Sequence, residues 1–302
     1  MSVGFGMILI TFILATLRST TPLLLAALGG VFSERSGVVN IALEGIMLTG
    51  AWAAAYFSFL TGSAWLGLLG AIVVGMLMAG IHGVISIKYH ADQVVSGTAI
   101  NILAVGFTEF MLNRIWGQAG SSPEVATLPS FGGLSLMIYL AFILAFVSWV
   151  ALYRTPWGLR LRSVGEHPLA ADTLGINVYQ MRYAGVLLSG ALGGMAGAAL
   201  SIGLLSRFVD GMSAGKGFIA LAAMIFGKWH PIGAVGATLL FGASQSLSTI
   251  FQLMGISGIP TQFFNMFPYV LTMLILAGFV GKSVAPAADG VRLQGGAGDD
   301  VQ

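Results

Sequence analysis

The stretch AWLGLLGAIVVGMLMAGIHGVISI, residues 64–87, decides the fold class, because it contains no Asp, Glu, Lys or Arg. A helix needs about 20 apolar residues to cross the hydrocarbon core of a bilayer. The run is continuously apolar and does not alternate between apolar and polar residues, so it is typical of a helix and not of a barrel strand. The stretch therefore predicts a membrane-spanning helix.

The composition extends this prediction to the whole chain. Of 302 residues, 57% are hydrophobic and 8% are charged, whereas soluble domains average roughly 45–50% and 25%. The mean hydropathy is +0.91. A net charge of +2 and the lack of cysteine exclude a basic nucleic-acid-binding surface and thiolate metal sites. The four histidines show no metal-ligand spacing, so neither a metal site nor a nucleic-acid partner is expected.

Further runs of spanning length occur along the chain, and two places are irregular. Residues 3–17 and 22–32 are short apolar pieces separated by polar residues 18–21, and residues 217–227 are too short to span. Interrupted segments are typical of discontinuous or re-entrant helices. The sequence predicts an all-α, polytopic helical membrane protein with about 8–10 transmembrane segments, including discontinuous helices. The other predicted spans are 37–62, 93–113, 133–153, 183–206, 231–253 and 263–281.

Lys and Arg in the short loops predict the orientation. Alternating the spans places eight of these residues on one side and three on the other, and the richer side is expected to be cytoplasmic. Residues 1–284 would form the transmembrane domain. Residues 285–302 would form a flexible cytoplasmic tail, and the loops at 116–131 and 207–216 would be external.

The longest polar segment is the cytoplasmic loop at residues 154–182, where a bundle connection usually has roughly 2–8 residues. Within it, residues 166–174 are expected to form a short amphipathic helix, preceded by Gly165 and stopped by Gly175. The helix could dock a soluble partner or lie on the membrane surface. The candidate docking residues are Gly165, Glu166, His167, Leu169, Ala170, Ala171, Leu174 and Gly175.

Four polar residues inside predicted spans are candidates for a translocation path. Glu44 lies one helical turn after Asn40, and Glu109 lies two turns after Asn101. A charge at the centre of a bilayer costs at least ~2.5–3.5 kcal/mol, so such residues often have a function. They could line a path for a polar solute, or they could pair with arginine side chains or backbone groups that hold the bundle together.

No nucleotide site or catalytic cluster is apparent. The nearest approach to the phosphate-binding pattern GxxxxGK[ST] ends in Gly281-Lys282-Ser283, but Leu276 occupies its first position. No nucleophile, base and orienting group occur together. The chain is therefore expected to have no catalytic residues, to bind no cofactor and not to be an enzyme.

Four blocks of sequence resemble those of a known protein family. Residues 32–45 (FSERSGVVNIALEG) closely resemble the signature of permease subunits of bacterial ABC importers, in the simple-sugar and nucleoside branch related to ribose permeases. The forms ERSGVVN and PYVLT are more similar to the nucleoside-type permeases. Three further blocks match in order: 158–176, which resembles the family's cytoplasmic coupling segment, 215–231 and 260–281.

The resemblance implies a division of labour among several chains. A separate ATPase, usually with tandem nucleotide-binding domains, would bind ATP, and a second homologous permease chain would complete the path through the bacterial inner membrane. An extracytoplasmic binding protein would deliver a nucleoside or simple sugar. The alternative is a stand-alone secondary transporter or channel for a small polar solute. That class would explain Glu44 and Glu109, but it gives no role to a helix in loop 154–182.

Overall fold

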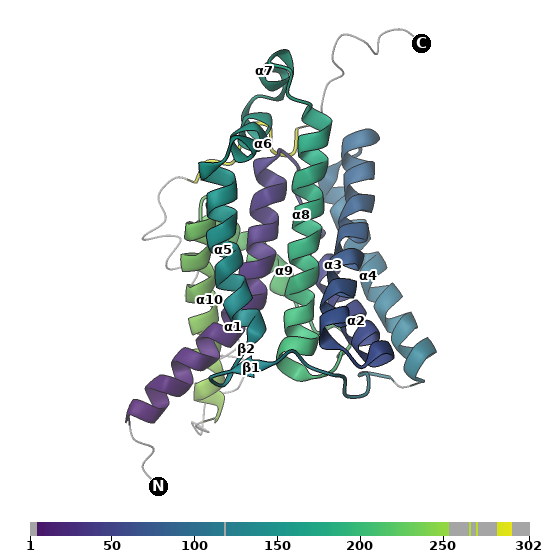
Figure 1. The fold of residues 1–302 in the computed structure, drawn as a ribbon, viewed down its shortest axis with the longest axis vertical. Coiled ribbons are helices and arrows are strands. Elements are labelled where there is room, and N and C mark those ends of the chain that lie inside the picture. Colours follow the sequence, from purple (N-terminus) through teal and green to yellow (C-terminus); the bar gives the residue numbers. More distant parts are fainter. Residues whose placement is uncertain (1–4, 118, 254–265, 267–269, 271–282, 292–302) are drawn as a thin grey trace.

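Long apolar helices form almost the whole of the computed structural model, which describes residues 5–117, 119–253, 266, 270 and 283–291. Two-residue strands β1 and β2 pair antiparallel near one end (Figure 1). The bounds are α1 Phe5–Arg35, α2 Leu43–Thr61, α3 Ala64–Gly83, α4 Gln93–Trp116, β1 Ser130–Phe131, β2 Leu134–Ser135, α5 Leu136–Arg154, α6 Pro156–Glu166, α7 Pro168–Thr173, α8 Val178–Ala198, α9 Lys216–Phe226 and α10 Pro231–Leu253; π-helical turns Val84–Lys88 and Ala199–Leu205 extend α3 and α8.

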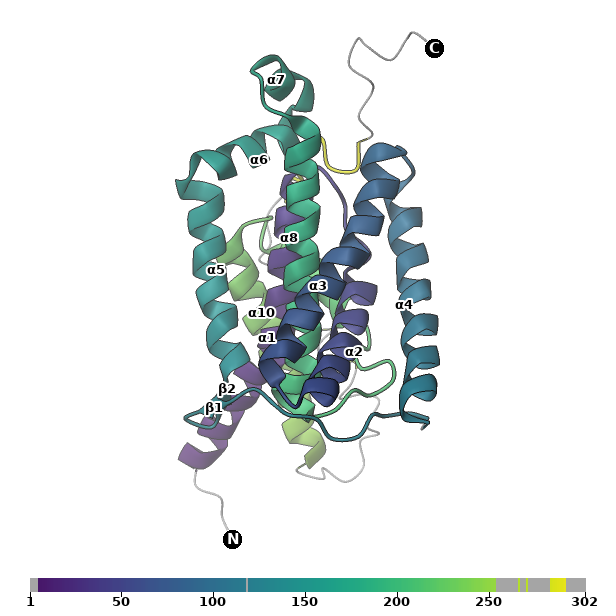
Figure 2. The same cartoon turned by 45° about the vertical axis from the view of Figure 1, so that its right-hand side comes forward.

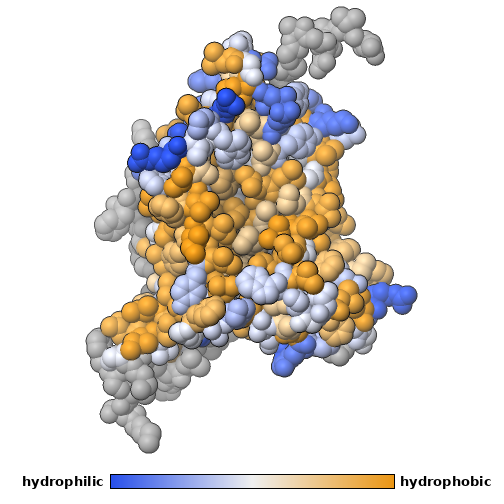
Figure 3. Space-filling view, viewed as in Figure 1, coloured by the Kyte–Doolittle hydropathy of each residue, from blue (hydrophilic) through white to orange (hydrophobic). Residues whose placement is uncertain are grey.

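Six helices of the described residues are long and apolar enough to cross a membrane, namely α1, α2, α3, α4, α5 and α8. On the face shown in Figure 3, an apolar band covers the middle and polar side chains gather toward both ends. The prediction of an all-α, multi-pass membrane protein is confirmed. Helix α9 has only 11 residues, as the short run at 217–227 indicated, and the span predicted at 263–281 lies outside the described residues.

The predicted interruption of the first helix at residues 18–21 is wrong. Helix α1 runs unbroken for 31 residues with Pro22 inside it. The polar side chains of this stretch find backbone acceptors without a break in the helix: Thr21 Oγ1 donates to the Leu17 carbonyl at 2.8 Å, and Thr20 Oγ1 donates to the Thr238 carbonyl at 3.3 Å. The chain instead leaves the helical conformation at residues 36–42, between α1 and α2.

Helices α2 and α8 lie at the centre of the bundle and α4 lies at its edge (Figure 2). In the most apolar window of the α8 segment 78% of residues are buried, against 28% for α4. Glycines allow the central helices to touch, since a Cβ on Gly194 of α8 would overlap the Ala71 carbonyl of α3. The end that carries α6 and α7 is called the α6 end, and the opposite end the β1 end (Figure 1).

Candidate functional site

The irregular segment at residues 36–42 interrupts the bundle between α1 and α2. Side chains of α3 and α4 satisfy its backbone: His82 Nε2 donates to the Val39 carbonyl at 2.9 Å, and Asn101 Nδ2 donates to the Ile41 carbonyl at 3.0 Å. Non-helical backbone inside a membrane protein needs partners within the protein, because lipid offers none. The break is therefore held by side chains from two other helices.

Glu44, in the first turn of α2, binds the start of α9. Its Oε1 accepts a hydrogen bond from the Gly215 amide at 2.8 Å, and its Oε2 accepts one from the Gly217 amide at 2.6 Å. The first amides of a helix lack intrahelical acceptors, and the helix dipole places partial positive charge there. The carboxylate is therefore stabilised inside the bundle by α9, which favours the bundle-holding interpretation for its charge.

A cavity of about 350 Å³ opens beside this contact. Glu44 and Asn101 line it, so the structure brings together two of the four residues predicted to line a path. Asn101 Oδ1 also accepts a hydrogen bond from the Gly45 amide at 2.8 Å, which orients its side chain. The remaining lining residues are Gly45, Leu48, Thr98, Ile102, Val105, Gly211, Ser213, Ala214 and Phe218.

The loop before α9 supplies part of this cavity, which sequence reasoning missed. The pattern at 207–216 indicated an external turn, yet Ser213 is only 2% exposed and the loop reaches the start of α2. Positive φ angles at Gly211, Ala214 and Gly215 fold the chain back on itself. The density of Gly and Ser was the available signal, but it does not tell an inward turn from an outward one.

The other two predicted path residues lie elsewhere. Asn40 is fully buried, and its Nδ2 donates to Ser189 Oγ of α8 at 2.8 Å. Glu109 lies on the exposed face of α4, where Asn113 Nδ2 donates to its backbone carbonyl at 3.2 Å. Asn101 faces α2 and Glu109 does not, so the two do not form one polar stripe.

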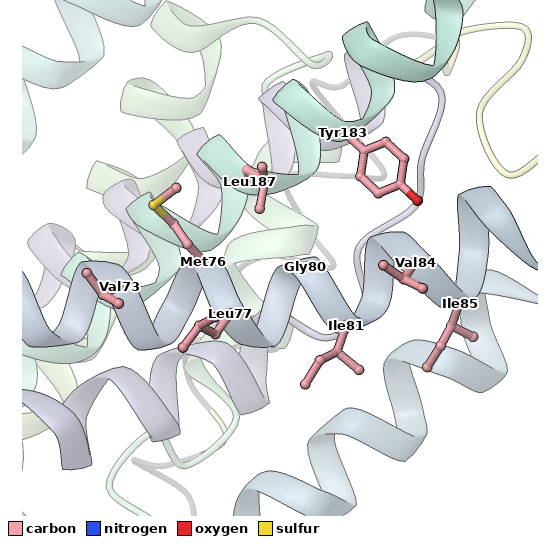
Figure 4. A pocket seen from close by; sticks show the side chains of 9 residues that line it. All are labelled: Val73, Met76, Leu77, Gly80, Ile81, Val84, Ile85, Tyr183 and Leu187. Atoms are coloured by element: carbon pink, nitrogen blue, oxygen red, sulfur yellow. The ribbon is translucent and has the colours of Figure 1, made fainter.

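A larger groove, of about 700 Å³, lies between α3 and α8 (Figure 4). Figure 4 shows Met76, Leu77 and Ile81 along α3, with Tyr183 and Leu187 of α8 opposite them. Its lining is apolar apart from the Tyr183 hydroxyl. A polar solute would lose its hydrogen bonds to water there without replacement. The smaller cavity at Glu44 and Asn101 is therefore the better candidate for contact with a polar solute.

At the α6 end, the predicted helix at 166–174 is divided between two elements. Glu166 ends α6, and α7 begins at Pro168, whose missing N–H costs nothing at a first helical position. Gly165 lies inside α6, where a Cβ would overlap the Arg35 carbonyl. Gly175 has φ +77 and ends the segment, as predicted.

Helix α7 projects beyond the bundle (Figure 1). Leu169 is 65% exposed and Leu174 is 81% exposed. Ala171 is buried and packs with Val164 and Val178, which fixes α7 on its base. A cleft of about 740 Å³ lies next to Leu174. His167 and Ala170 are also exposed, so the predicted docking face is open.

Glu166 points toward the bundle and not toward this face. Its carboxylate lies 3.6 Å from Arg35 Nη1, and its Oε2 accepts a hydrogen bond from the Ala287 amide at 3.2 Å. The residue therefore joins α6 to α1 and to the C-terminal part of the chain. Among the predicted docking residues, the outward-facing apolar ones are Leu169 and Leu174.

The bundle of spanning helices, with a polar break inside it and a short helix exposed at one end, is that of a multi-pass membrane protein. The chain belongs to the permease family described as "Branched-chain amino acid transport system / permease component", whose sequence profile matches residues 12–276. The match covers most of the chain and confirms the predicted permease class.

Comparison with individual relatives gives a more specific class of permease. The chain is 49% identical to the guanosine ABC transporter permease protein NupQ of Bacillus subtilis (92% of this chain, 94% of the relative) and 45% identical to the nucleoside ABC transporter permease protein NupC of Lactococcus lactis (90% and 93%). A second guanosine permease protein of B. subtilis, NupP, is 28% identical (89% and 81%). No solved structure matches. The prediction of an ABC importer permease is confirmed.

Proposed function

We propose that the chain forms, together with a second homologous permease chain, the path by which a nucleoside enters the cell, and that a separate ATPase drives the transport. The nucleoside assignment is supported by the guanosine and nucleoside permeases at 49% and 45% identity. The observation that carries the proposed docking of a separate ATPase is the exposure of two leucines, Leu169 on α7 and Leu174 directly after it, which the described chain leaves largely uncovered.

The ATPase is proposed to dock on α7. Burying a leucine side chain contributes about 1.5–3 kcal/mol, so Leu169 and Leu174 together can stabilise a docked state substantially. The sequence lacks the phosphate-binding pattern GxxxxGK[ST], so ATP and its hydrolysis are assigned to the partner, with no cofactor in this chain. A stand-alone transporter would have no use for apolar side chains held out from the bundle.

The second permease chain is proposed to cover the exposed face of α4. Glu109 lies on that face, and its carboxylate has no hydrogen-bond partner in the described part of the chain. A carboxylate facing lipid is costly, whereas one at an interface between two chains, or on a water-filled path between them, finds polar partners. The occurrence of two guanosine permease proteins in B. subtilis, NupQ and NupP, supports a pair of different homologous chains.

The α6 end is proposed to face the cytoplasm of a bacterium, and the β1 end to receive an extracytoplasmic solute-binding protein. Because the chain has no cysteine, one introduced cysteine is uniquely labelled. We expect Ala170→Cys, exposed on α7, to react with an impermeant reagent only in inverted vesicles, and Ser130→Cys, exposed on β1, to react in intact cells. The opposite pattern would invert the orientation.

Reconstitution tests the function directly. Proteoliposomes containing the permease pair, the ATPase and the binding protein should take up labelled guanosine when ATP is present on the ATPase side, and unlabelled nucleosides should compete. Uptake of labelled ribose, measured in the same proteoliposomes, tests the simple-sugar class. Uptake of ribose but not guanosine would move the assignment to sugars. Uptake by this chain alone, without ATP, would favour a secondary transporter or channel.

A further inference from the structure

Residues 283–291, called the C-terminal strap, lie at the α6 end of the molecule, beside the first turn of α8 (yellow in Figure 2). The flexible tail predicted from residue 285 onward is wrong for residues 285–291, since they form a turn packed on the bundle; residues 292–302 lie outside the described residues. Ser283 Oγ begins the strap by donating to the Ile225 carbonyl of α9 at 2.9 Å.

The strap binds the last turn of α6. The Ala288 amide donates to the Gly165 carbonyl at 2.9 Å, and the Ala287 amide donates to Glu166 Oε2 at 3.2 Å. Ala288 is only 5% exposed, so its methyl group is packed and not merely touching. These contacts lie directly before α7, which begins two residues after Glu166. The strap therefore holds the base of the proposed docking helix.

The strap also binds α1 and α8. The Asp289 carboxyl faces the Glu34 carboxyl of α1, and Arg182 of α8 lies close enough to attract it. Arg182 is 1% exposed, and its Nη1 donates to the Val291 carbonyl at 3.2 Å. Burial raises the pKa of Asp289 to about 7, although the contacts with Glu34 and Arg182 act to lower it.

The helices that the strap joins also reach the cavity region. Helix α1 leads directly into the break at residues 36–42, and α8 holds the break through Ser189, which accepts a hydrogen bond from Asn40. A displacement of α7 can therefore reach the break only if the base of α7 moves with α1 and α8. Within the described residues and outside the strap, the side-chain polar contact between α6 and α1 is the 3.6 Å pair of Glu166 and Arg35.

We propose that the C-terminal strap is a positioning element for coupling: by fastening the end of α6 to α1 and α8, it makes these helices follow the movement that the ATPase imposes on α7. The proposal rests on the proposed docking of the ATPase at α7. It assigns the strap no contact with the solute or with the ATPase, and Ala288 and Asp289 act only through α6, α1 and α8.

The test compares two substitutions of the same chemistry in the full reconstituted complex. Ala288→Asp places an unpaired carboxylate at a buried position, whereas Ala285→Asp, three residues earlier, places it at an exposed one. ATP hydrolysed and guanosine transported are measured in the same proteoliposomes. Ala288→Asp should release the strap from α6, because an unpaired carboxylate is costly to bury, and should lower the solute transported per ATP by about tenfold while the ATPase still copurifies. Ala285→Asp should keep the parental ratio.

The outcomes separate this proposal from the proposed function. A parental ratio for Ala288→Asp, with Leu169→Asp inactive, would overturn the strap inference alone. Normal transport by Leu169→Asp would overturn docking at α7. If Ala288→Asp does not accumulate as folded protein, the smaller change Ala288→Cys is compared with Ala285→Cys. The buried thiol should be labelled much more slowly than the exposed one, and equal labelling rates in the assembled complex would overturn the strap.

Discussion

Glu44 and the leucine pair Leu169 and Leu174 each have side chains whose polarity does not match their surroundings. The described chain supplies partners for Glu44 and leaves the two leucines exposed. Glu44 is a carboxylate inside an apolar bundle, and two backbone amides at the start of α9 satisfy it at 2.8 and 2.6 Å. Leu169 and Leu174 are apolar side chains at a polar end of the molecule, 65% and 81% exposed, and the described chain does not cover them.

The difference indicates where another chain is needed. A polar group that is satisfied internally can stabilise one arrangement of two helices, here the start of α2 against the start of α9. Exposed apolar side chains gain stability only when a partner buries them. The Glu44 region is therefore expected to set the shape of the path from within, and the α7 region to receive force from outside.

The largest effect should come from the α7 region. Leu169→Asp replaces an apolar contact by a charge at the proposed interface, so we expect uptake to be abolished and copurification of the ATPase to be lost, while membrane insertion and the contact with the second permease persist. Leu169→Met, which keeps an apolar side chain of similar volume, is the matched control and should transport at close to the parental rate. Transport by Leu169→Asp with the ATPase still bound would contradict the comparison.

An intermediate effect is expected at Glu44. In Glu44→Gln one oxygen is replaced by an NH₂ group, so one amide of α9 loses its acceptor, and the charge that faces the helix dipole is lost. An unsatisfied buried donor costs about 1–3 kcal/mol. We expect a lower thermal midpoint and about a tenfold loss of uptake per folded molecule, a change worth about 1.4 kcal/mol.

Glu109→Gln is the matched control for that substitution. It makes the same chemical change on α4, at a carboxylate that no group in the described chain stabilises. The thermal midpoint of the isolated chain should therefore be unchanged. If Glu44→Gln also leaves the uptake rate and the thermal midpoint unchanged, the contact between Glu44 and α9 does not maintain the cavity for solute.

The sequence predicted those features that depend on local signals. Continuous apolar runs placed most of the spanning helices, with differences of several residues at some ends, and Gly175 correctly predicted the end of α7 because a left-handed backbone favours glycine. Helix α9 was also predicted to be too short to span, because its apolar run is short. In each case the decisive residues lie within the element itself.

Features that depend on distant partners were missed. Polar residues 18–21 suggested a break, but Thr20 is satisfied by the Thr238 carbonyl, 218 positions away. The real break at residues 36–42 is stable because His82 and Asn101 reach it from other helices. Likewise, the small residues of the C-terminal strap carry no sign of the Gly165 carbonyl that the Ala288 amide binds. Local composition does not identify such partners.

The smallest effect should come from the pH dependence of the strap. The pKa of Asp289 rises from its ordinary value of 3.8 to about 7 in the docked strap, chiefly because the carboxyl is buried. The docked state therefore holds a proton that the free strap has lost. Docking should therefore weaken as the pH rises toward 7, where the carboxyl of the docked strap loses its proton, and the effect on transport near neutral pH should be small. The groups that face Asp289 are Glu34 and Arg182, and both act to lower its pKa against the larger effect of burial.

This dependence can be measured as the labelling rate of Ala288→Cys in the assembled complex between pH 6 and pH 8, divided by the rate for the exposed Ala285→Cys so that thiol ionisation cancels. The ratio should rise up to pH 7 and then level off.

In an Asp289→Asn background, which keeps the shape but removes the titrating proton, the rise should disappear. A rise that persists in that background would assign the titration to another group, whereas a flat ratio in the parental chain would show that Asp289 does not hold its proton when the strap is docked. Glu44 takes no part in this titration, so Glu44→Gln should show the same pH profile as the parental chain. The contributions of the strap and of the Glu44 contact can therefore be distinguished by pH as well as by substitution.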